Sequence, residues 1–272
     1  SKLIEFFLKN IPSKKIFFNS DLIDIKNQAK ISLQFRNKEI EEFDYIVAAD
    51  GVFSKTKQIL FKKDGLPKYF NSIALRGKIS DFENSDISLY LGPNFHFVIY
   101  PINQNKEFNF ISIIRKKLIE EEMSNRDLFN DNTFIENLLN QISSKSKFNL
   151  DEKVEEIKCF PIFVSKKFHI PSSKKIFLTG DAFYSFPPSF AQGASQSIEA
   201  TNELLKDLEN NSSSYYKKRI LKTKQINSRS TFNHFAFHLS NPINIFIRDI
   251  FLRRLSKNKI FLENYLGKIY TN

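Results

Sequence analysis

The sequence has few of the residues on which disulfide frameworks, metal sites and membrane spans depend. Its 272 residues include one cysteine and four histidines. The single cysteine, Cys159, excludes an internal disulfide and fits a reducing cytoplasm. The scattered histidines have no ligand spacing, so no metal is predicted. No apolar run approaches the ~20 residues that span a bilayer, and no signal peptide is visible. We therefore expect a soluble, cytoplasmic protein.

Acidic residues are in the minority, with 30 Asp and Glu against 41 Lys and Arg and a formal net charge of +11. Such a balance is typical of proteins that bind nucleic acid or anionic membranes. Here the Lys, Asn, Ile and Phe enrichment is spread along the whole chain. A general compositional bias explains the charge more simply than a dedicated basic surface. We predict no nucleic-acid partner.

Glycine is scarce, and none occurs before Gly51. The Gly-x-Gly-x-x-Gly turn that cradles the pyrophosphate of a dinucleotide is therefore absent from these residues. The chain begins Ser1-Lys2-Leu3, without Met, and enters directly on a helix-like pattern. We expect a chain that is missing its beginning.

The most informative stretch runs from Lys175 to Leu208. Ile176 to Thr179 is a short run of β-forming residues closed by Gly180, which predicts a buried strand that ends in a tight turn. Asp181 follows at the carboxyl end of this strand, where open α/β sheets place their ligands. From the turn alone, Asp181 is equally compatible with a structural turn or capping residue.

A long helix is predicted to begin near Gln192, Gly193 and Ala194, because Pro187 and Pro188 keep the preceding loop extended. Its apolar residues repeat at spacings of four and three and form one face: Ala194, Ile198, Thr201, Leu205 and Leu208. Gly193 leaves the first turn bare. Backbone amides there can therefore approach an anion or an electron-rich carbonyl.

This stretch resembles the second FAD-binding signature of the flavin-dependent aromatic hydroxylases, the p-hydroxybenzoate hydroxylase-like monooxygenases. The matching residues are Gly180-Asp181-Ala182, Pro188, Ala191-Gln192-Gly193-Ala194 and Ile198-Glu199. The resemblance implies that Asp181 binds the ribityl chain of FAD. It also implies that the amides after Pro188 face the pyrimidine end of the isoalloxazine. The sequence departs from the family at Phe183-Tyr184, Ala191 and Ala200, where members have Ala-His, often Gly, and Asp.

An earlier segment resembles the same family. Phe43 to Ala49 predicts an apolar strand, buried on both faces in a parallel sheet, and Ser54 is placed to cap a helix over Lys55 to Phe61. Asp50 and Gly51 between them form a common turn. Together with Lys57, they resemble a family segment that touches FAD and the route of the nicotinamide cofactor. The resemblance adds Asp50 to the cofactor site, with Lys57 where the family usually has Arg.

A second, antiparallel sheet is predicted between Asn71 and Arg115, because short strand-like segments alternate with turn residues. The segments are Ser72 to Ile79, Ile87 to Leu91, His96 to Tyr100 and Phe108 to Ile114. Their order resembles the substrate-domain sheet of the salicylate hydroxylase-like branch, which roofs the flavin. The resemblance implies a substrate pocket lined by Phe183, Tyr184, Phe186, Arg76, His96 and Tyr100. The last three are also compatible with ordinary sheet residues, and we assign no catalytic residue.

The remaining segments complete the predicted scaffold. A meander is expected over Lys15 to Phe18, Leu22 to Ile25 and Ile31 to Phe35, a helical outer layer or lid over Glu120 to Lys147, a strand over Lys153 to Phe160 and a helix over Tyr215 to Ser230. Near the end, apolar residues alternate with arginines: Phe246, Ile250, Phe251 and Leu255 with Arg248, Arg253 and Arg254. A packing face is the favoured interpretation of this segment, ahead of a membrane contact.

The predicted fold is α/β: a remnant of a Rossmann-like FAD-binding domain, an antiparallel substrate domain and C-terminal helices. The expected domains are 1–68 for the first part of the FAD-binding domain, 69–165 for the substrate domain, 166–210 for the return segment and 211–272 for the C-terminal helices.

The resemblance implies an FAD-dependent monooxygenase that hydroxylates a small aromatic substrate with O₂ and NADH or NADPH, as a monomer or homodimer. Two alternatives stay open. One is a membrane-associated flavoprotein of ubiquinone or prenyl-lipid metabolism, and the other is a non-catalytic basic binding module or degenerate copy.

Overall fold

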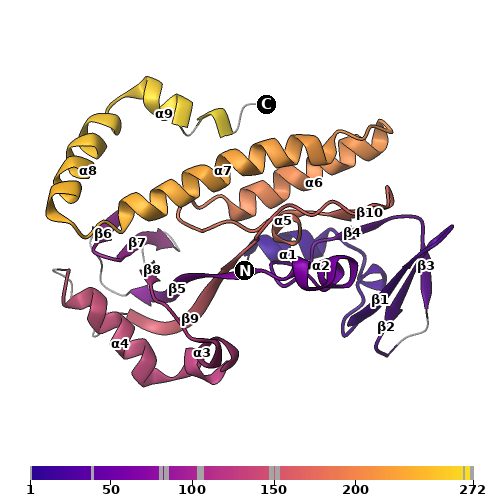
Figure 1. Cartoon of the computed structure of the whole chain (residues 1–272), viewed down its shortest axis with the longest axis horizontal. Coiled ribbons are helices and arrows are strands. Elements are labelled where there is room, and N and C mark those ends of the chain that lie inside the picture. The colour runs from indigo at the N-terminus through magenta and orange to yellow at the C-terminus, as the bar shows by residue number, and fades with distance from the viewer. Residues whose placement is uncertain are drawn as a thin grey trace.

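The computed structural model describes residues 2–37, 40–79, 82, 86–102, 107–146, 150, 154–265 and 267–269. Its helices are α1 (Lys2–Lys9), α2 (Lys55–Phe61), α3 (Glu120–Ser124), α4 (Asn132–Ser143), α5 (Gly180–Phe183), α6 (Gly193–Glu209), α7 (Tyr215–Phe237), α8 (Pro242–Leu255) and α9 (Lys259–Tyr265) (Figure 1). Its strands are β1 (Leu22–Asn27), β2 (Ile31–Phe35), β3 (Glu41–Phe43), β4 (Ile46–Ala48), β5 (Lys68–Ile79), β6 (Ser88–Gly92), β7 (Phe95–Ile102), β8 (Glu107–Arg115), β9 (Val154–Val164) and β10 (Ile176–Leu178). The predicted mixture of α/β and antiparallel elements is confirmed.

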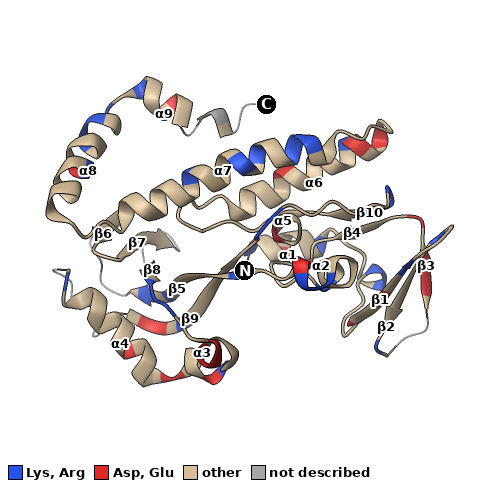
Figure 2. Cartoon of the chain, viewed as in Figure 1, with Lys and Arg blue, Asp and Glu red and all other residues tan. Residues whose placement is uncertain are grey.

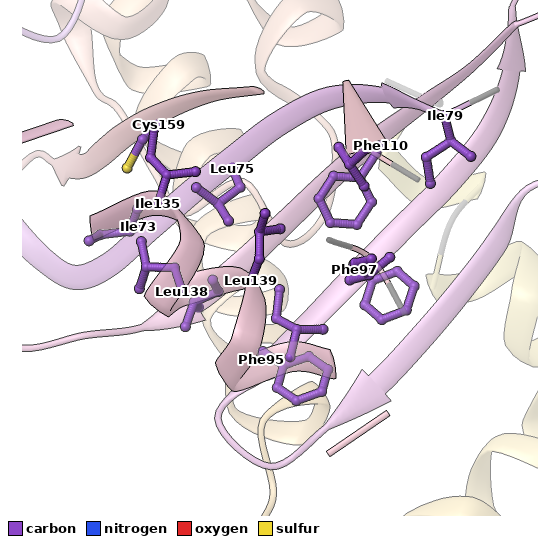
Figure 3. Close-up of a cluster of buried hydrophobic side chains, with 14 of the residues drawn as sticks. Ile73, Leu75, Ile79, Phe95, Phe97, Phe110, Ile135, Leu138, Leu139 and Cys159 are labelled. Carbon is purple, nitrogen blue, oxygen red and sulfur yellow. The ribbon is translucent and has the colours of Figure 1, made fainter. Parts of the chain in front are cut away.

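The main core lies on one face of a five-stranded antiparallel sheet with the order β6-β7-β8-β5-β9. The four strands predicted between Asn71 and Arg115 are its β5 to β8. Because side chains alternate between the two faces of a strand, one face collects the apolar residues, and α4 covers it (Figure 3). The buried residues there include Ile73, Leu75, Ile79, Phe95, Phe97, Phe110, Leu138, Leu139 and Ile142. The segment predicted as an outer layer or lid is therefore an outer layer.

The opposite face of this sheet carries polar side chains. The register pairs Arg76 with Ile111 and Tyr100 with Asn109, and alternation along β7 places His96 on the same side as Tyr100. The carboxyl end of α7 reaches this face, where His238 contacts His96. All three sheet residues predicted for the pocket therefore share the face that is turned away from α4.

A second, small sheet pairs β10 with β4 in parallel, with Ile176 opposite Ile46. The expected parallel pairing is present, but the strand predicted over Phe43 to Ala49 is wrong in two respects. Phe43 ends β3 instead, and Val47 is 46% exposed, so β4 is not buried on both faces. The continuous apolar run hid the break at Asp44-Tyr45, where the chain leaves one sheet and enters the other.

The helix after this strand follows its prediction. α2 spans Lys55–Phe61, and the Ser54 hydroxyl accepts a hydrogen bond of 2.9 Å from the Lys57 amide. A serine cap satisfies one of the amides that a helix start leaves unpaired.

The predicted meander is only partly present. Strands β1 and β2 pair, but Phe17 and Phe18 lie outside any strand and are exposed.

Helices α6 and α7 run side by side along the upper part of the molecule (Figure 1). The predicted apolar face of α6 is not the buried one, since Ile198 and Leu205 are more than half exposed. The buried residues are Gln196, Ala200, Leu204 and Asp207. The physical reason is that Arg219 of α7 binds polar side chains on the other face of α6, Gln196 among them. The periodicity of apolar residues does not detect such a contact.

The C-terminal helices also differ from expectation. α8 was predicted to pack through its apolar residues, but none of its residues is buried. α7 is longer than predicted and runs to Phe237. β9 begins at Val154, and the predicted first residue of that strand, Lys153, lies outside the described residues. In the part of the chain that the structure describes, no helix is both long and apolar enough to cross a membrane.

Candidate cofactor site

The turn after β10 lies against the start of α6. The Thr179 amide donates to the Ala48 carbonyl at 3.0 Å, which ties the ends of β10 and β4 together. Gly180 follows with φ +55°, and a Cβ atom there would lie 2.9 Å from the Ser197 Oγ on α6. Both the left-handed backbone and the close approach require glycine. Gly180, where the turn was predicted, is the first residue of the short helix α5. This helix start places Asp181 just beyond the end of β10.

The loop that precedes α6 ends in a tight turn. The Ala191 amide donates to the Pro188 carbonyl at 2.9 Å, and Ala191 has φ +52°. Gln192 is the N-cap of α6 and Gly193 is its first residue, so the helix begins where it was predicted. A Cβ atom on Gly193 would meet no atom within 4 Å. The positive end of the helix dipole therefore adjoins open space.

The strand-end turn and the start of α6 converge on the same hollows. One hollow of about 200 Å³ is lined by Ala49, Gly51, Thr179, Gly180, Asp181, Ser197 and Thr201. A neighbouring crevice of about 10 Å³, which is room for a single water molecule, is lined by Gly180, Asp181, Phe183, Tyr184, Phe186, Gly193, Gln196, Ser197, Ala200, Arg219 and Thr223. The structure thus brings together residues that the sequence places in two separate motifs.

A buried lysine lies near both carboxylates of this region. Lys57 is 1% exposed, and its side chain makes no hydrogen bond or ion pair among the described residues. Burial lowers the pKa of Lys57, while the nearby Asp50 and Asp181 carboxylates act to raise it. Burial likewise raises the pKa of Asp181, and Lys57 opposes that shift. Asp50 is fixed separately, because its Oδ2 accepts from the Thr56 amide at 2.9 Å.

The Pro188 loop is braced by the second half of α7. Ser230 donates from its hydroxyl to the Pro187 carbonyl, and Asn233 donates to the Ser189 carbonyl at 3.2 Å. His234 lies between two hydroxyls, with Nδ1 3.3 Å from Ser189 Oγ and Nε2 3.4 Å from Ser72 Oγ of β5. Sequence analysis missed these residues. The only signal was the placement of His234 and His238 four residues apart, on one helix face.

The three sheet residues predicted for the pocket differ in burial and in hydrogen bonding. His96 is 4% exposed, and its Nδ1 lies 2.7 Å from the Nε2 of His238. Burial lowers the pKa of His96 to about 3. Tyr100 accepts a hydrogen bond from the side chain of Asn109, and Arg76 is exposed. None of these three lines the two hollows at the strand end.

The aromatic residues after Asp181 divide between core and hollow. Phe183 is 3% exposed and packs on Phe168 and Tyr216, so it belongs mainly to the small core under β10. Tyr184 stacks on Phe168 with the ring centres 4.3 Å apart. Tyr184 and Phe186 are half-buried. These two are therefore the aromatic side chains best placed to contact a ligand.

A family model described as an FAD binding domain matches residues 15–229. The chain belongs to this family. That assignment agrees with the resemblance found in the sequence motifs.

The curated relatives that this chain matches are described as monooxygenases. The FAD-dependent monooxygenase eupB of Phoma sp is 22% identical over 214 residues, which cover 73% of this chain and 48% of the relative. A flavin-dependent monooxygenase of Legionella longbeachae is 25% identical over 209 residues, or 70% of this chain and 50% of the relative. The dual trans-enoyl reductase/FAD-dependent monooxygenase tazHJ of Aspergillus terreus is 22% identical, and 32% of its length is covered. The chain thus spans about a third to a half of these relatives.

Solved structures share the fold. The Klebsiella pneumoniae HpxO structure with FAD and uric acid superposes with a TM-score of 0.81 at 15% identity, covering 98% of this chain and 70% of HpxO. A salicylate hydroxylase substrate complex gives a TM-score of 0.75 at 16% identity, covering 98% and 73%. Both structures cover nearly the whole of this chain with one fold.

The residues of the site fit the cofactor that the family implies. Gly51 has φ +76° and, like Gly193, no atom within 4 Å of an added Cβ. Both positions leave backbone bare and open beside Asp50 and Asp181, as a cofactor with many hydroxyls and an electron-rich ring requires. A carboxylate is a strong acceptor for a hydroxyl group.

Proposed function

We propose that the protein is an FAD-dependent monooxygenase that hydroxylates a small aromatic substrate with O₂ and NADH or NADPH. The observation that carries the proposal is the convergence at the end of β10, where Gly180 and Asp181 meet Gly193, the first residue of α6. Gly180 and Asp181 also line the hollow of about 200 Å³ at the ends of β10 and β4. The monooxygenase descriptions of the relatives give it the reaction class. FAD, when bound, would supply the redox chemistry that moves one oxygen atom of O₂ to the substrate.

The residues at the strand ends would hold the cofactor. Asp181 would accept a hydrogen bond from a ribityl hydroxyl, and Asp50 would add a second acceptor at the end of β4. The amides of Gly193 and Ala194 would face the electron-rich end of the flavin ring, because unpaired amides and the helix dipole favour negative charge there. Pro188 and Gln192 would fix the loop that leads to these amides.

The aromatic wall and the sheet would form the substrate side. Tyr184 and Phe186 border the hollow and would exclude water from the reacting atoms. Arg76 and Tyr100 share one face of the large sheet with His96, and a planar substrate would lie between this face and the Pro188 loop. That uric acid is bound in HpxO, and that salicylate hydroxylase has the same fold, supports a small planar substrate.

The proposal is tested with the visible spectrum of the purified full protein. We expect flavin absorbance in the wild type, and Asp181→Ala to weaken FAD binding by roughly thirtyfold, because a lost charged acceptor costs about 2 kcal/mol. Asp127→Ala is the control, since Asp127 is exposed and lies far along the chain in the outer layer.

Activity provides the second readout. A small aromatic substrate should accelerate the FAD-dependent oxidation of NADH or NADPH and appear as a hydroxylated product. A wild-type protein without flavin, or an Asp181→Ala variant that binds FAD as tightly as the control, would contradict the proposal.

A further inference from the structure

Helix α8 exposes an apolar stripe from Ile243 to Phe251. The stripe residues follow the spacing i, i+3, i+4, i+7 and i+8, which places them on one side of a helix: Ile243, Phe246, Ile247, Ile250 and Phe251, which are 70%, 66%, 46%, 39% and 58% exposed. A surface helix normally turns such a stripe to the protein core. Here the stripe faces solvent, and α8 forms an arm beyond the end of α7 (Figure 1).

The orientation of α8 is held by specific contacts. The Asn241 side chain accepts from the amides of Ile243 and Asn244 at 2.9 and 3.3 Å and so fixes the start of the helix. Arg248 binds back to α7 through the Ala236 carbonyl at 3.4 Å and pairs with Asp249 at 2.8 Å. The half-buried residues of α8, which are Ile245, Arg248, Asp249 and Leu255, mark the side that faces the protein, and the stripe lies away from it.

Basic residues follow the stripe at one end. Arg253 and Arg254 lie in the last turn of α8, and Lys257 and Lys259 follow (Figure 2). None of these four makes an ion pair among the described residues, unlike Arg248. An apolar stripe with free basic residues beside it is complementary to a surface that offers both acyl chains and negative charge.

We propose that α8 docks in the plane of an anionic lipid bilayer surface. The apolar stripe enters the boundary between headgroups and acyl chains, and the four basic residues contact lipid phosphates. With 14 residues the helix is ~21 Å long at 1.5 Å per residue. It is therefore shorter than the ~30 Å hydrocarbon core and lies on the membrane without crossing it.

The charge of the chain favours lipid over a second copy as the occupant. The formal net charge is +11, so two copies that met through α8 would bring like charges together, whereas an anionic surface attracts them. The inference does not depend on the proposed function, because α8 lies apart from the residues that line the hollows at the strand end.

The test is sedimentation of the full protein with vesicles. We expect binding to vesicles of equal parts phosphatidylcholine and phosphatidylglycerol, weaker binding at high salt, and little binding to phosphatidylcholine alone. Phe246→Ser with Phe251→Ser, and separately Arg253→Glu with Arg254→Glu, should each lower the partition coefficient roughly tenfold or more. All four side chains are exposed, so melting temperature and FAD content should not change.

Matched control variants on α7 distinguish binding through α8 from nonspecific binding to the vesicles. Leu221→Ser with Phe232→Ser removes two equally exposed apolar side chains, and Lys217→Glu with Lys218→Glu makes the same charge change. The apolar control should bind as the wild type does, and the charge control should lose far less binding than Arg253→Glu with Arg254→Glu, although it lowers the net charge equally. Binding that falls equally in the controls, or is absent from anionic vesicles, overturns the proposal. A concentration-dependent dimer that the Phe246→Ser, Phe251→Ser variant abolishes, without vesicle binding, also overturns it and assigns the stripe to a second copy.

Discussion

The Nδ1 atom of His96, on β7, lies 2.7 Å from the Nε2 atom of His238, at the end of α7. The ring centre of His234 lies 4.1 Å from that of His238, and the two ring nitrogens of His234 face Ser189 and Ser72. The three histidines therefore connect the large sheet to the loop that precedes α6. This buried contact is where the candidate substrate and cofactor sides of the protein are held together.

The histidine cluster predicts a loss of stability in acid. Burial lowers the pKa of His96 to about 3, of His234 to about 4 and of His238 to about 2, with smaller effects from each other and from Arg115. Each pKa is lower in the folded protein than the ordinary 6.5 of the unfolded chain. The unfolded state therefore binds more protons below about pH 6.5, and stability is lost as the pH falls below that value.

The measurement is the free energy of unfolding between pH 7.5 and 5, with NMR titration of the imidazole signals. We expect stability to fall toward pH 5, by up to about 1.4 kcal/mol per pH unit for each histidine that stays neutral in the folded state. The three cluster histidines should still be neutral at pH 5.5. Imidazoles that titrate near pH 6.5 in the folded protein would contradict the buried contact.

His234 is predicted to stabilise the Pro188 loop as well as the fold. His234→Ala leaves the buried Ser72 and Ser189 hydroxyls without their shared partner, at a cost of about 1 to 3 kcal/mol. Hydrogen exchange of the Ala191 amide should also become faster, since its acceptor is the carbonyl of Pro188 in the same loop.

A matched control lies one residue along α7. Phe235 is 56% exposed, so Phe235→Ala should change neither the free energy of unfolding nor the exchange of the loop. If the Ala191 amide exchanged at the same rate in both variants, His234 would not stabilise the loop specifically.

Arg219 is predicted to be the strongest single polar contact between α6 and α7. It is 3% exposed and binds Gln196 at 2.9 Å, Glu203 at 3.3 Å and Glu199 at 3.5 Å. Arg219→Leu leaves two partly buried carboxylates without this partner and should cost about 3 kcal/mol or more. Lys222, 3.1 Å from Glu199, compensates one of them only in part.

A double-mutant cycle in urea measures this contact. Adding Glu203→Leu to Arg219→Leu should recover part of the loss, because it removes a carboxylate that has lost its partner. Additive losses in the double variant would show that the two side chains are not coupled.

Local patterns predicted the elements whose causes are local. Ser54 and the apolar spacing after it predict α2 with its correct ends, and the turn residues between Asn71 and Arg115 predict four strands of the large sheet. The strand-end turn at Gly180 and the helix start at Gly193 follow from single residues with one conformational consequence each.

The errors arose where distant residues decide the structure. The buried face of α6 is set by Arg219 on the next helix, not by the apolar row that includes Ile198. His234 and His238 meet Ser72 and His96 across more than 140 residues of chain, and no local pattern encodes such a pairing. The exposed stripe of α8 has the same period as a packing face, so sequence alone cannot tell which side it faces.

We infer that the open space beside Gly193 holds FAD, and the dissociation constant of FAD from the Gly193→Ala variant measures this. An added Cβ meets no protein atom within 4 Å, so the variant should fold as stably as the wild type. Gly267→Ala, which adds the same methyl group away from the site, is the control. We predict at least roughly tenfold weaker FAD binding for Gly193→Ala alone. Equal FAD binding by the wild type and both variants would contradict the account.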